Sequence, residues 1–152
     1  MKAEEFDRYD GLGLAELVRR DEASAGELLD VAIARVEARN PALNAVVTRL
    51  YDQARAAVAA GLPEGPFTGV PYLLKDLGAH YTGAVTSFGS ALFKDFVVDH
   101  DSEITARLRR AGLGIGFVGL RKGCVHRAHG LLRFLRWSGD AAQAPDVRYI
   151  WE

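Results

Sequence analysis

The sequence predicts an α/β fold in which N-terminal helices are followed by short strands layered with further helices. Apolar residues recur at helical spacing through most of the first 60 residues. A short apolar run at residues 70–74 is bounded by segments rich in glycine and proline, which is typical of a buried strand. A helical pattern at residues 101–110 leads into another apolar run, and this succession of helix and strand indicates a layered α/β architecture.

Helical spacing and its stop signals predict three helices in the N-terminal part of the chain. They are expected at residues 12–20, 24–40 and 50–60. The clearest start signal is Ser24 followed by Glu27, a capping box in which each side chain satisfies a backbone N–H at the helix start. We expect this helix to end at Asn40-Pro41, because a proline disfavours helical backbone in the residue before it.

The apolar run at residues 70–74 is predicted to be a buried strand. Pro71 cannot donate a hydrogen bond to a neighbouring strand, so it is expected at the start of the strand or at an edge of the sheet. The small residues that follow predict an irregular loop over residues 78–90.

A last helix and a last strand are predicted after this loop. Asp101-Ser102 can cap a helix that runs to Arg110. The apolar face of this helix is expected to contain Ile104, Leu108 and Ala111. Residues 111–118 then have the pattern of a helix end, a turn and a strand.

Composition excludes several classes of protein. The 152 residues are 49% hydrophobic and 26% charged, which suits one soluble domain or a part of a larger one and excludes an intrinsically disordered chain. The single cysteine, Cys124, cannot form an internal disulfide, so a reducing compartment is expected. No secretory signal and no run of 18 apolar residues is visible. We therefore expect a cytoplasmic protein that makes no membrane contact.

Charge is distributed unevenly along the chain. Residues 1–113 contain 13 basic and 17 acidic residues, a net charge of −4, whereas residues 114–152 contain 6 and 3, a net charge of +3. The basic residues of the second part include Arg121, Lys122, Arg127, Arg133 and Arg136. They are few and interleaved with acidic residues, so a solvated surface is favoured over a nucleic-acid partner.

Lys75 is the strongest candidate for a catalytic residue. It closes the predicted buried strand, where loss of hydration lowers the pKa of an amine and makes it available as a base. Asp76 opposes this effect, since an adjacent carboxylate favours the charged ammonium. By pattern alone, a structural or surface lysine is the more common case. Ser87 and Ser90 lie in the small-residue loop and read as hydroxyls that bond to the backbone.

One group of metal-ligating residue types is present near the C-terminus. Cys124, His126 and His129 lie close together in the sequence. A closed zinc site needs four ligands, and a helix does not place residues at this spacing on one face. We therefore predict that the chain has no metal site here.

The segment around Lys75 resembles the lysine-bearing segment of the amidase signature family. The likeness is carried by GPFTGVPYLLKDLGAHYTGAVTSFGSALFKDF at residues 65–96, and its most specific parts are GVPYLLKD and TSFGS. The flanking segments ASAGELLDVAIARVEARNPALNAVV and DHDSEITARLRRAGL resemble the family's N-terminal helices and the helix after the lysine loop. The resemblance covers roughly residues 10–113.

This resemblance implies a mixed sheet layered between helices and hydrolysis of small-molecule amides without metal or organic cofactor. It also implies a Ser–Ser–Lys catalytic unit, in which a neutral lysine deprotonates a bridging serine and this serine activates the nucleophilic serine. Lys75 is then the general base, and Gly89 and Ser90 belong to the loop that lines the substrate site.

The chain departs from the family pattern after residue 113. Intact relatives continue into a segment of the type GGSSGG that supplies both serines, whereas the serines here are Ser24, Ser87, Ser90, Ser102 and Ser138, none in such a context. We therefore predict an incomplete amidase-signature fold at residues 1–113, inactive by itself. Residues 114–152 are expected to be a divergent basic tail, either the product of a frameshift or a poorly ordered segment.

Two other hypotheses stay open. The chain could be a small non-catalytic subunit that pairs with a second copy or another chain, because a truncated sheet leaves an open strand edge that invites association. A short active amidase that uses Ser87 or Ser90 is the least favoured, since the sequence shows no group that would activate either hydroxyl.

Overall fold

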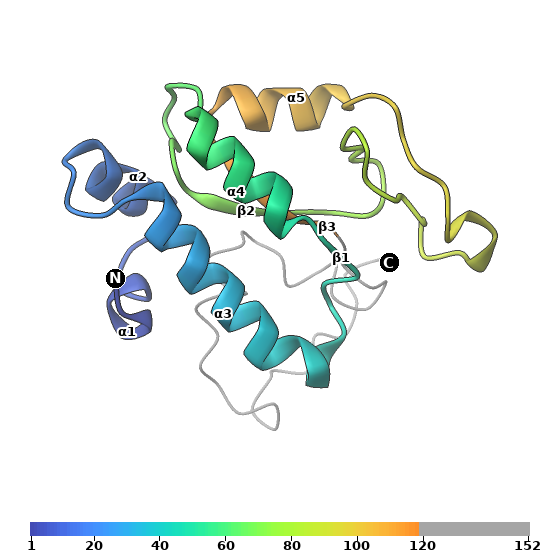
Figure 1. The fold of residues 1–152 in the computed structure, drawn as a ribbon, viewed down its shortest axis with the longest axis horizontal. Helices are drawn as coiled ribbons and strands as arrows, with labels where there is room; N and C mark the ends of the chain where they lie inside the picture. Colours follow the sequence, from blue (N-terminus) through green and yellow to red (C-terminus); the bar gives the residue numbers. More distant parts are fainter. Residues whose placement is uncertain (119–152) are drawn as a thin grey trace, which may run out of the picture.

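Three short strands form a mixed sheet on which the helices pack (Figure 1). A computed structural model describes residues 1–118 of the chain. The elements, in chain order, are α1 (Ala3–Phe6), α2 (Gly11–Arg19), α3 (Ala25–Leu43), β1 (Thr48–Arg49), α4 (Tyr51–Ala60), β2 (Pro71–Leu74), the 3-10 helix η1 (Ala91–Phe93), α5 (Glu103–Arg110) and β3 (Gly114–Val118). This arrangement confirms the predicted α/β fold class.

β3 lies in the centre of the sheet, between β1 and β2. It runs parallel to β2, with Leu74 opposite Val118, and antiparallel to β1, with Thr48 opposite Val118. Pro71 is the first residue of β2, and β2 is an edge strand among the residues described, so both expectations for this proline are confirmed. A parallel pair needs a long connection, and here it consists of a loop followed by α5.

Two groups of buried apolar side chains lie against the sheet. The larger joins the N-terminal helices to β2, and its members include Leu14, Leu28, Val36, Val70 and Leu73. The smaller contains Leu50, Leu74, Ala79, Ala84 and Ile115. Leu73 and Leu74 belong to different groups because successive side chains of a strand point to opposite faces. Burial on both faces explains why β2 reads as a continuous apolar run.

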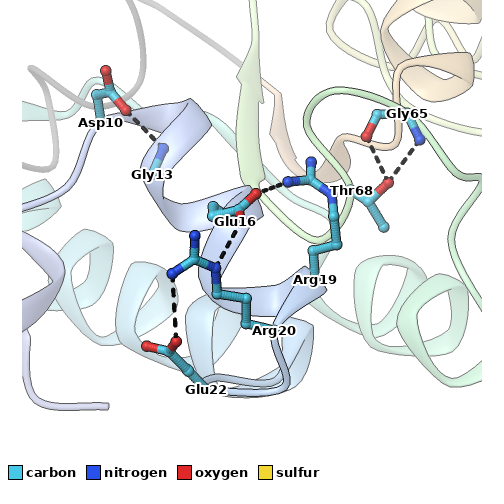
Figure 2. A network of polar contacts seen from close by, with 8 residues as sticks. All are labelled: Asp10, Gly13, Glu16, Arg19, Arg20, Glu22, Gly65 and Thr68. Carbon is cyan, nitrogen blue, oxygen red and sulfur yellow. Dashed lines mark hydrogen bonds and ion pairs between the residues drawn. The ribbon is translucent and has the colours of Figure 1, made fainter.

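Caps and local ion pairs define the first helices (Figure 2). Asp10 begins α2 by accepting a hydrogen bond from the Gly13 backbone N–H at 2.7 Å. Glu16 on the same helix pairs with both Arg19 and Arg20. The capping box at Ser24 is confirmed, since its hydroxyl accepts from the Glu27 N–H at 3.2 Å and the Glu27 carboxylate accepts from the Ser24 N–H at 2.8 Å.

The loop before β2 is held against the turn that follows α5. The Thr68 hydroxyl bridges the backbone of Gly65, accepting from its N–H at 2.8 Å and donating to its carbonyl at 3.0 Å (Figure 2). Gly112 has a φ of +88°, and a Cβ there would lie 2.6 Å from the Cα of Thr68. Only glycine therefore permits this close approach, which sets the start of β3 beside the start of β2.

The structure corrects the predicted end of the second helix. α3 continues through Pro41 to Leu43 instead of ending at Asn40. Asn40 explains the extra turn, because its Oδ1 accepts from the N–H groups of Ala45 and Val46 at 2.9 and 2.8 Å and its Nδ2 donates to the Val46 carbonyl at 2.9 Å. These bonds to the segment beyond the helix offset the one bond that a proline cannot donate.

Three smaller differences concern local elements. α1 and β1 were not predicted, since four and two residues are too short to show a periodicity. Ser102 precedes α5 as expected but makes no side-chain cap to the helix backbone. The expected apolar face of α5 is wrong at Ile104, which is 49% exposed, whereas Thr105 is fully buried. The Thr105 hydroxyl tolerates burial because it bonds to the Ser102 hydroxyl at 3.0 Å.

Replacement of Asn40 tests this account of the α3 terminus. Asn40→Ala removes three hydrogen bonds and leaves buried backbone groups unpaired, so we expect the free energy of unfolding to fall by about 2–4 kcal/mol in urea denaturation of the full chain. Gln53→Ala, at an exposed amide on α4, is the control and should change stability by less than about 0.5 kcal/mol. Equal losses for the two variants would contradict this role of Asn40.

The capping box predicts a pH dependence. Hydrogen bonds from the Ser24 backbone and hydroxyl lower the pKa of Glu27 from 4.5 to about 2. A lowered folded-state pKa contributes stability above the unfolded-state pKa and loses it as pH falls toward the folded-state value. Glu27→Gln should therefore unfold at a lower temperature than the unmodified chain at neutral pH, and the difference should shrink between about pH 4.5 and about pH 2. A difference that is constant with pH would contradict the prediction.

Candidate functional site

Lys75 directly follows β2, at the carboxyl end of the parallel strand pair. Ligand and catalytic sites of α/β sheets occur at this edge, because loops from neighbouring parallel strands meet there. The Lys75 side chain is half-buried. Among residues 1–118 it makes no hydrogen bond and no ion pair, so no described carboxylate holds its ammonium. The position agrees with a lysine that is available to an incoming group.

Asp76, the neighbour of Lys75, is turned toward the loop after the strand. Its side chain is 6% exposed, and its two carboxylate oxygens accept hydrogen bonds from Ser87, one from the backbone N–H at 2.9 Å and one from the hydroxyl at 2.5 Å. The sequence suggested that Asp76 would favour a charged Lys75. That effect stays a prediction; in the structure, this carboxylate anchors a loop eleven residues further along the chain.

Residues 87–90 form a tight turn on this anchor. Phe88 and Gly89 both have left-handed backbone, with φ values of 52° and 69°. The Ser87 hydroxyl accepts from the Gly89 N–H at 3.2 Å, and the Ser90 N–H donates to the Ser87 carbonyl at 2.8 Å. The Ser90 hydroxyl accepts from the Leu92 N–H at 3.2 Å and begins η1. Both serines therefore bond to the backbone, as expected of loop hydroxyls.

The loop between β2 and α5 is folded back on itself and extends from the end of the sheet (Figure 1). Its two halves are joined by backbone hydrogen bonds, among them Gly83 N–H to the Val98 carbonyl at 2.8 Å and Thr86 N–H to the Phe96 carbonyl at 2.9 Å. Six of its large apolar side chains are exposed, namely Leu77, Phe88, Leu92, Phe93, Phe96 and Val97. This apolar surface lies on the same segment as the candidate substrate loop.

None of the serines within residues 1–118 is hydrogen-bonded to Lys75. Ser87 is bonded to Asp76, Ser90 caps η1, and Ser24 and Ser102 stand before α3 and α5. Within residues 1–118, no group of three or more His, Cys, Asp or Glu side chains has the geometry of a metal site. The described part of the chain thus places Lys75 at the end of β2 next to a loop that is fixed by Asp76 and Ser87.

Several predictions concern residues outside the described part. Cys124, His126 and His129, the basic residues from Arg121 to Arg136, and Ser138 all lie beyond residue 118. They stay predictions. No helix within the described range is both long and apolar enough to cross a membrane.

Sequence reasoning missed the pairing of Asp76 with Ser87. Nothing in the residue pattern marks an aspartate and a serine eleven positions apart as partners, because the loop between them sets their distance. The small residues Gly83 and Ala84 indicated only that this loop was irregular.

Comparison with known proteins also finds similarity to amidases, along most of the described chain. A family model described as Amidase matches residues 27–117. The 6-aminohexanoate-cyclic-dimer hydrolase of Pseudomonas sp. (strain NK87) is 43% identical over 105 residues, which cover 68% of this chain and 21% of the relative. A putative amidase, AmiC, of Mycobacterium tuberculosis (strain ATCC 25618 / H37Rv) is 38% identical over 114 residues, which cover 74% of this chain and 23% of the relative.

Solved structures agree with the sequence matches. A 6-aminohexanoate cyclic dimer hydrolase bound to its substrate superposes with a TM-score of 0.68 at 39% identity, over 73% of this chain and 23% of that protein. A bacterial aryl acylamidase of the amidase signature family superposes with a TM-score of 0.68 at 30% identity, over 74% and 25%. The fold is thus part of the amidase-signature fold. The chain belongs to the amidase family, and it spans about a fifth of the length of the curated relatives cited here.

Substitutions at the anchor test its role in holding the loop. Asp76→Ala leaves the Ser87 amide and hydroxyl without their acceptor, so we expect a loss of about 2–4 kcal/mol in unfolding free energy and faster hydrogen exchange at the Ser87 amide. Ser87→Ala keeps the backbone bond and should lose less, about 1–2 kcal/mol. Asp95→Ala, at an exposed carboxylate of the same loop, is the matched control. Similar exchange rates in Asp76→Ala and Asp95→Ala would show that the anchor does not fix the turn.

Proposed function

We propose that this chain forms the lysine-bearing N-terminal part of an amidase that hydrolyses the carbon–nitrogen bond of a small-molecule amide. The observation that carries the proposal is the position of Lys75. It lies half-buried at the carboxyl end of a parallel strand pair. The carboxylate of its neighbour Asp76 is hydrogen-bonded to Ser87. The names of the relatives support an amide as the substrate class.

In this proposal Lys75 is the general base. A neutral amine accepts the proton of a bridging serine, which takes the proton of a nucleophilic serine as that oxygen attacks the amide carbonyl. Backbone N–H groups then stabilise the negative charge on the carbonyl oxygen. Gly89 and Ser90 line the site as part of the turn that Asp76 anchors. The chemistry requires no metal and no organic cofactor.

We further propose that the chain is inactive by itself. None of its five serines lies in a Gly-Ser-Ser-Gly context, and none of those within residues 1–118 is bonded to Lys75. Residues 1–113 form the amidase-like part in this proposal, and residues 114–152 a divergent basic segment of frameshifted origin, most of which lies outside the described residues. Residues 114–118 of that segment nevertheless form the central strand β3.

The alternative is a non-catalytic subunit derived from an amidase. One observation favours it: β2 is an edge strand in the described part of the chain, and six large apolar side chains of the following loop are exposed. An open edge and an apolar patch together favour association with a second chain. A location in the cytoplasm is compatible with both proposals.

Complementation tests the role of Lys75. The purified chain alone should not hydrolyse 6-aminohexanoate cyclic dimer or an aryl acylamide above background. Mixed with the remaining part of a 6-aminohexanoate cyclic dimer hydrolase, which holds the family's serines, it should show hydrolysis. Lys75→Met and Lys75→Arg should lower that activity by about 10²–10⁴-fold, because neither side chain is a neutral amine that accepts a proton.

Lys94→Met is the matched control, since Lys94 is an exposed lysine of the same loop. It should leave the restored activity unchanged. Hydrolysis that persists in Lys75→Met would contradict the proposed role. A stable complex of the two polypeptides without any hydrolysis would favour the non-catalytic alternative.

A further inference from the structure

In the loop between β2 and α5, residues 80–82 are hydrogen-bonded to residues 99–102. We call these two paired segments the histidine clasp. The His80 N–H donates to the Ser102 hydroxyl at 3.1 Å, and the Ser102 N–H donates to the His80 carbonyl at 3.2 Å. The N–H and the hydroxyl of Thr82 both donate to Asp101 at 2.8 Å. Four hydrogen bonds therefore hold the two segments of the clasp together.

Both histidines of the described chain meet on this clasp. Nδ1 of His80 lies 3.4 Å from Nε2 of His100, and the rings are inclined at 72° with their centroids 5.3 Å apart. The other nitrogen of His100, Nδ1, lies 2.8 Å from a carboxylate oxygen of Asp99. Two imidazole nitrogens thus face one another on a backbone that is already fixed.

We propose that His80 Nδ1 and His100 Nε2 bind a divalent transition-metal ion of the Zn²⁺ or Ni²⁺ class. The site would be an open one with two protein ligands, unlike a closed four-ligand zinc site: the ion would join the two ends of the loop and take no part in amide hydrolysis. The two histidines supply two ligands, and water completes the coordination of an ion at this exposed position.

The distance between the two nitrogens suits this purpose. Ligand nitrogens about 2.0–2.1 Å from a tetrahedral Zn²⁺ are about 3.3 Å apart, close to the spacing in the structure. Neutral imidazole is also the most common protein ligand for these ions. Without metal, the same spacing allows a weak hydrogen bond in which one ring donates its proton to the other. The ion takes the place of that proton.

Asp99 selects the tautomer of His100 that metal binding requires. An ionised carboxylate only accepts hydrogen bonds, so Nδ1 of His100 carries the proton and the lone pair of Nε2 faces His80. A carboxylate behind a metal-binding histidine is a recurrent arrangement that orients the ring and strengthens the ligand.

The charged groups around the clasp do not oppose a cation. Asp99 adds a negative charge beside His100, and the charge of Arg109 is matched by Asp101, which lies 2.7 Å from it. His80 also contacts Phe88 edge to face, with ring centroids 5.9 Å apart. An ion on His80 would therefore also restrain the turn that contains Ser87 and Ser90.

Metal titration of the full chain tests the proposal. The other metal-ligating candidates are first removed in a background variant with Cys124→Ser, His126→Ala and His129→Ala. We expect this background to bind one Zn²⁺ or Ni²⁺ per chain by calorimetry and to unfold at a higher temperature when the metal is added. His80→Ala and His100→Ala, each added to the background, should weaken binding by about tenfold or more and abolish the thermal shift.

Asp99→Asn reports on the orientation of His100 and should weaken binding by about tenfold. Asp95→Asn, at an exposed carboxylate of the same loop, should not change it. Circular dichroism establishes that each variant keeps its fold, which is expected because the His100 side chain is 64% exposed. Loss of binding in the background variant, or unchanged affinity in folded His80→Ala or His100→Ala, would overturn the proposal.

Discussion

The parallel pairing of β2 with β3 is the constraint on which the rest of this structure depends. The two strands are distant in the sequence, and their starts are brought together by close backbone contacts at Gly112 and by a hydrogen bond from the Gly114 N–H to the Val70 carbonyl at 2.8 Å. Because parallel strands end at the same edge, the pairing places Lys75 where a site can form. It also requires a long connection between the two strands. The loop in that connection contains the turn anchored by Asp76 and the histidine clasp.

Two sets of hydrogen bonds hold the loop between β2 and α5 in a defined conformation. At one end, buried Asp76 holds Ser87 through both carboxylate oxygens. At the other, the segments around His80 and Ser102 are joined through backbone and side-chain hydrogen bonds. Both hydrogen bonds that the Asp76 carboxylate accepts come from Ser87, and none comes from the adjacent Lys75. Within residues 1–118, Asp76 thus fixes the loop and forms no ion pair with Lys75.

The chain belongs to the amidase family and covers about a fifth of the length of the relatives cited above. Both facts bear on which part of the catalytic unit it could supply. In the function proposed above, Lys75 is the lysine of a Ser–Ser–Lys unit, and the two serines are expected outside residues 1–118. A general base contributes to catalysis only when a proton donor lies within hydrogen-bond reach. The exposed apolar side chains from Leu77 to Val97 are consistent with a surface that contacts such a larger part.

The sequence by itself determined the fold class, the main helices, β2 and β3, the capping box at Ser24 and the position of Lys75 at a strand end, because these features depend on local periodicity and on caps a few residues apart. Only the tertiary structure decided that α3 passes through Pro41, that Thr105 is buried and Ile104 exposed, and that Asp76 holds Ser87. Each of these depends on contacts between segments whose distance is set by the folded loop or sheet. Local residue preferences carry no record of such distances, so the partners of Asp76 and of His80 could not be read from the chain alone.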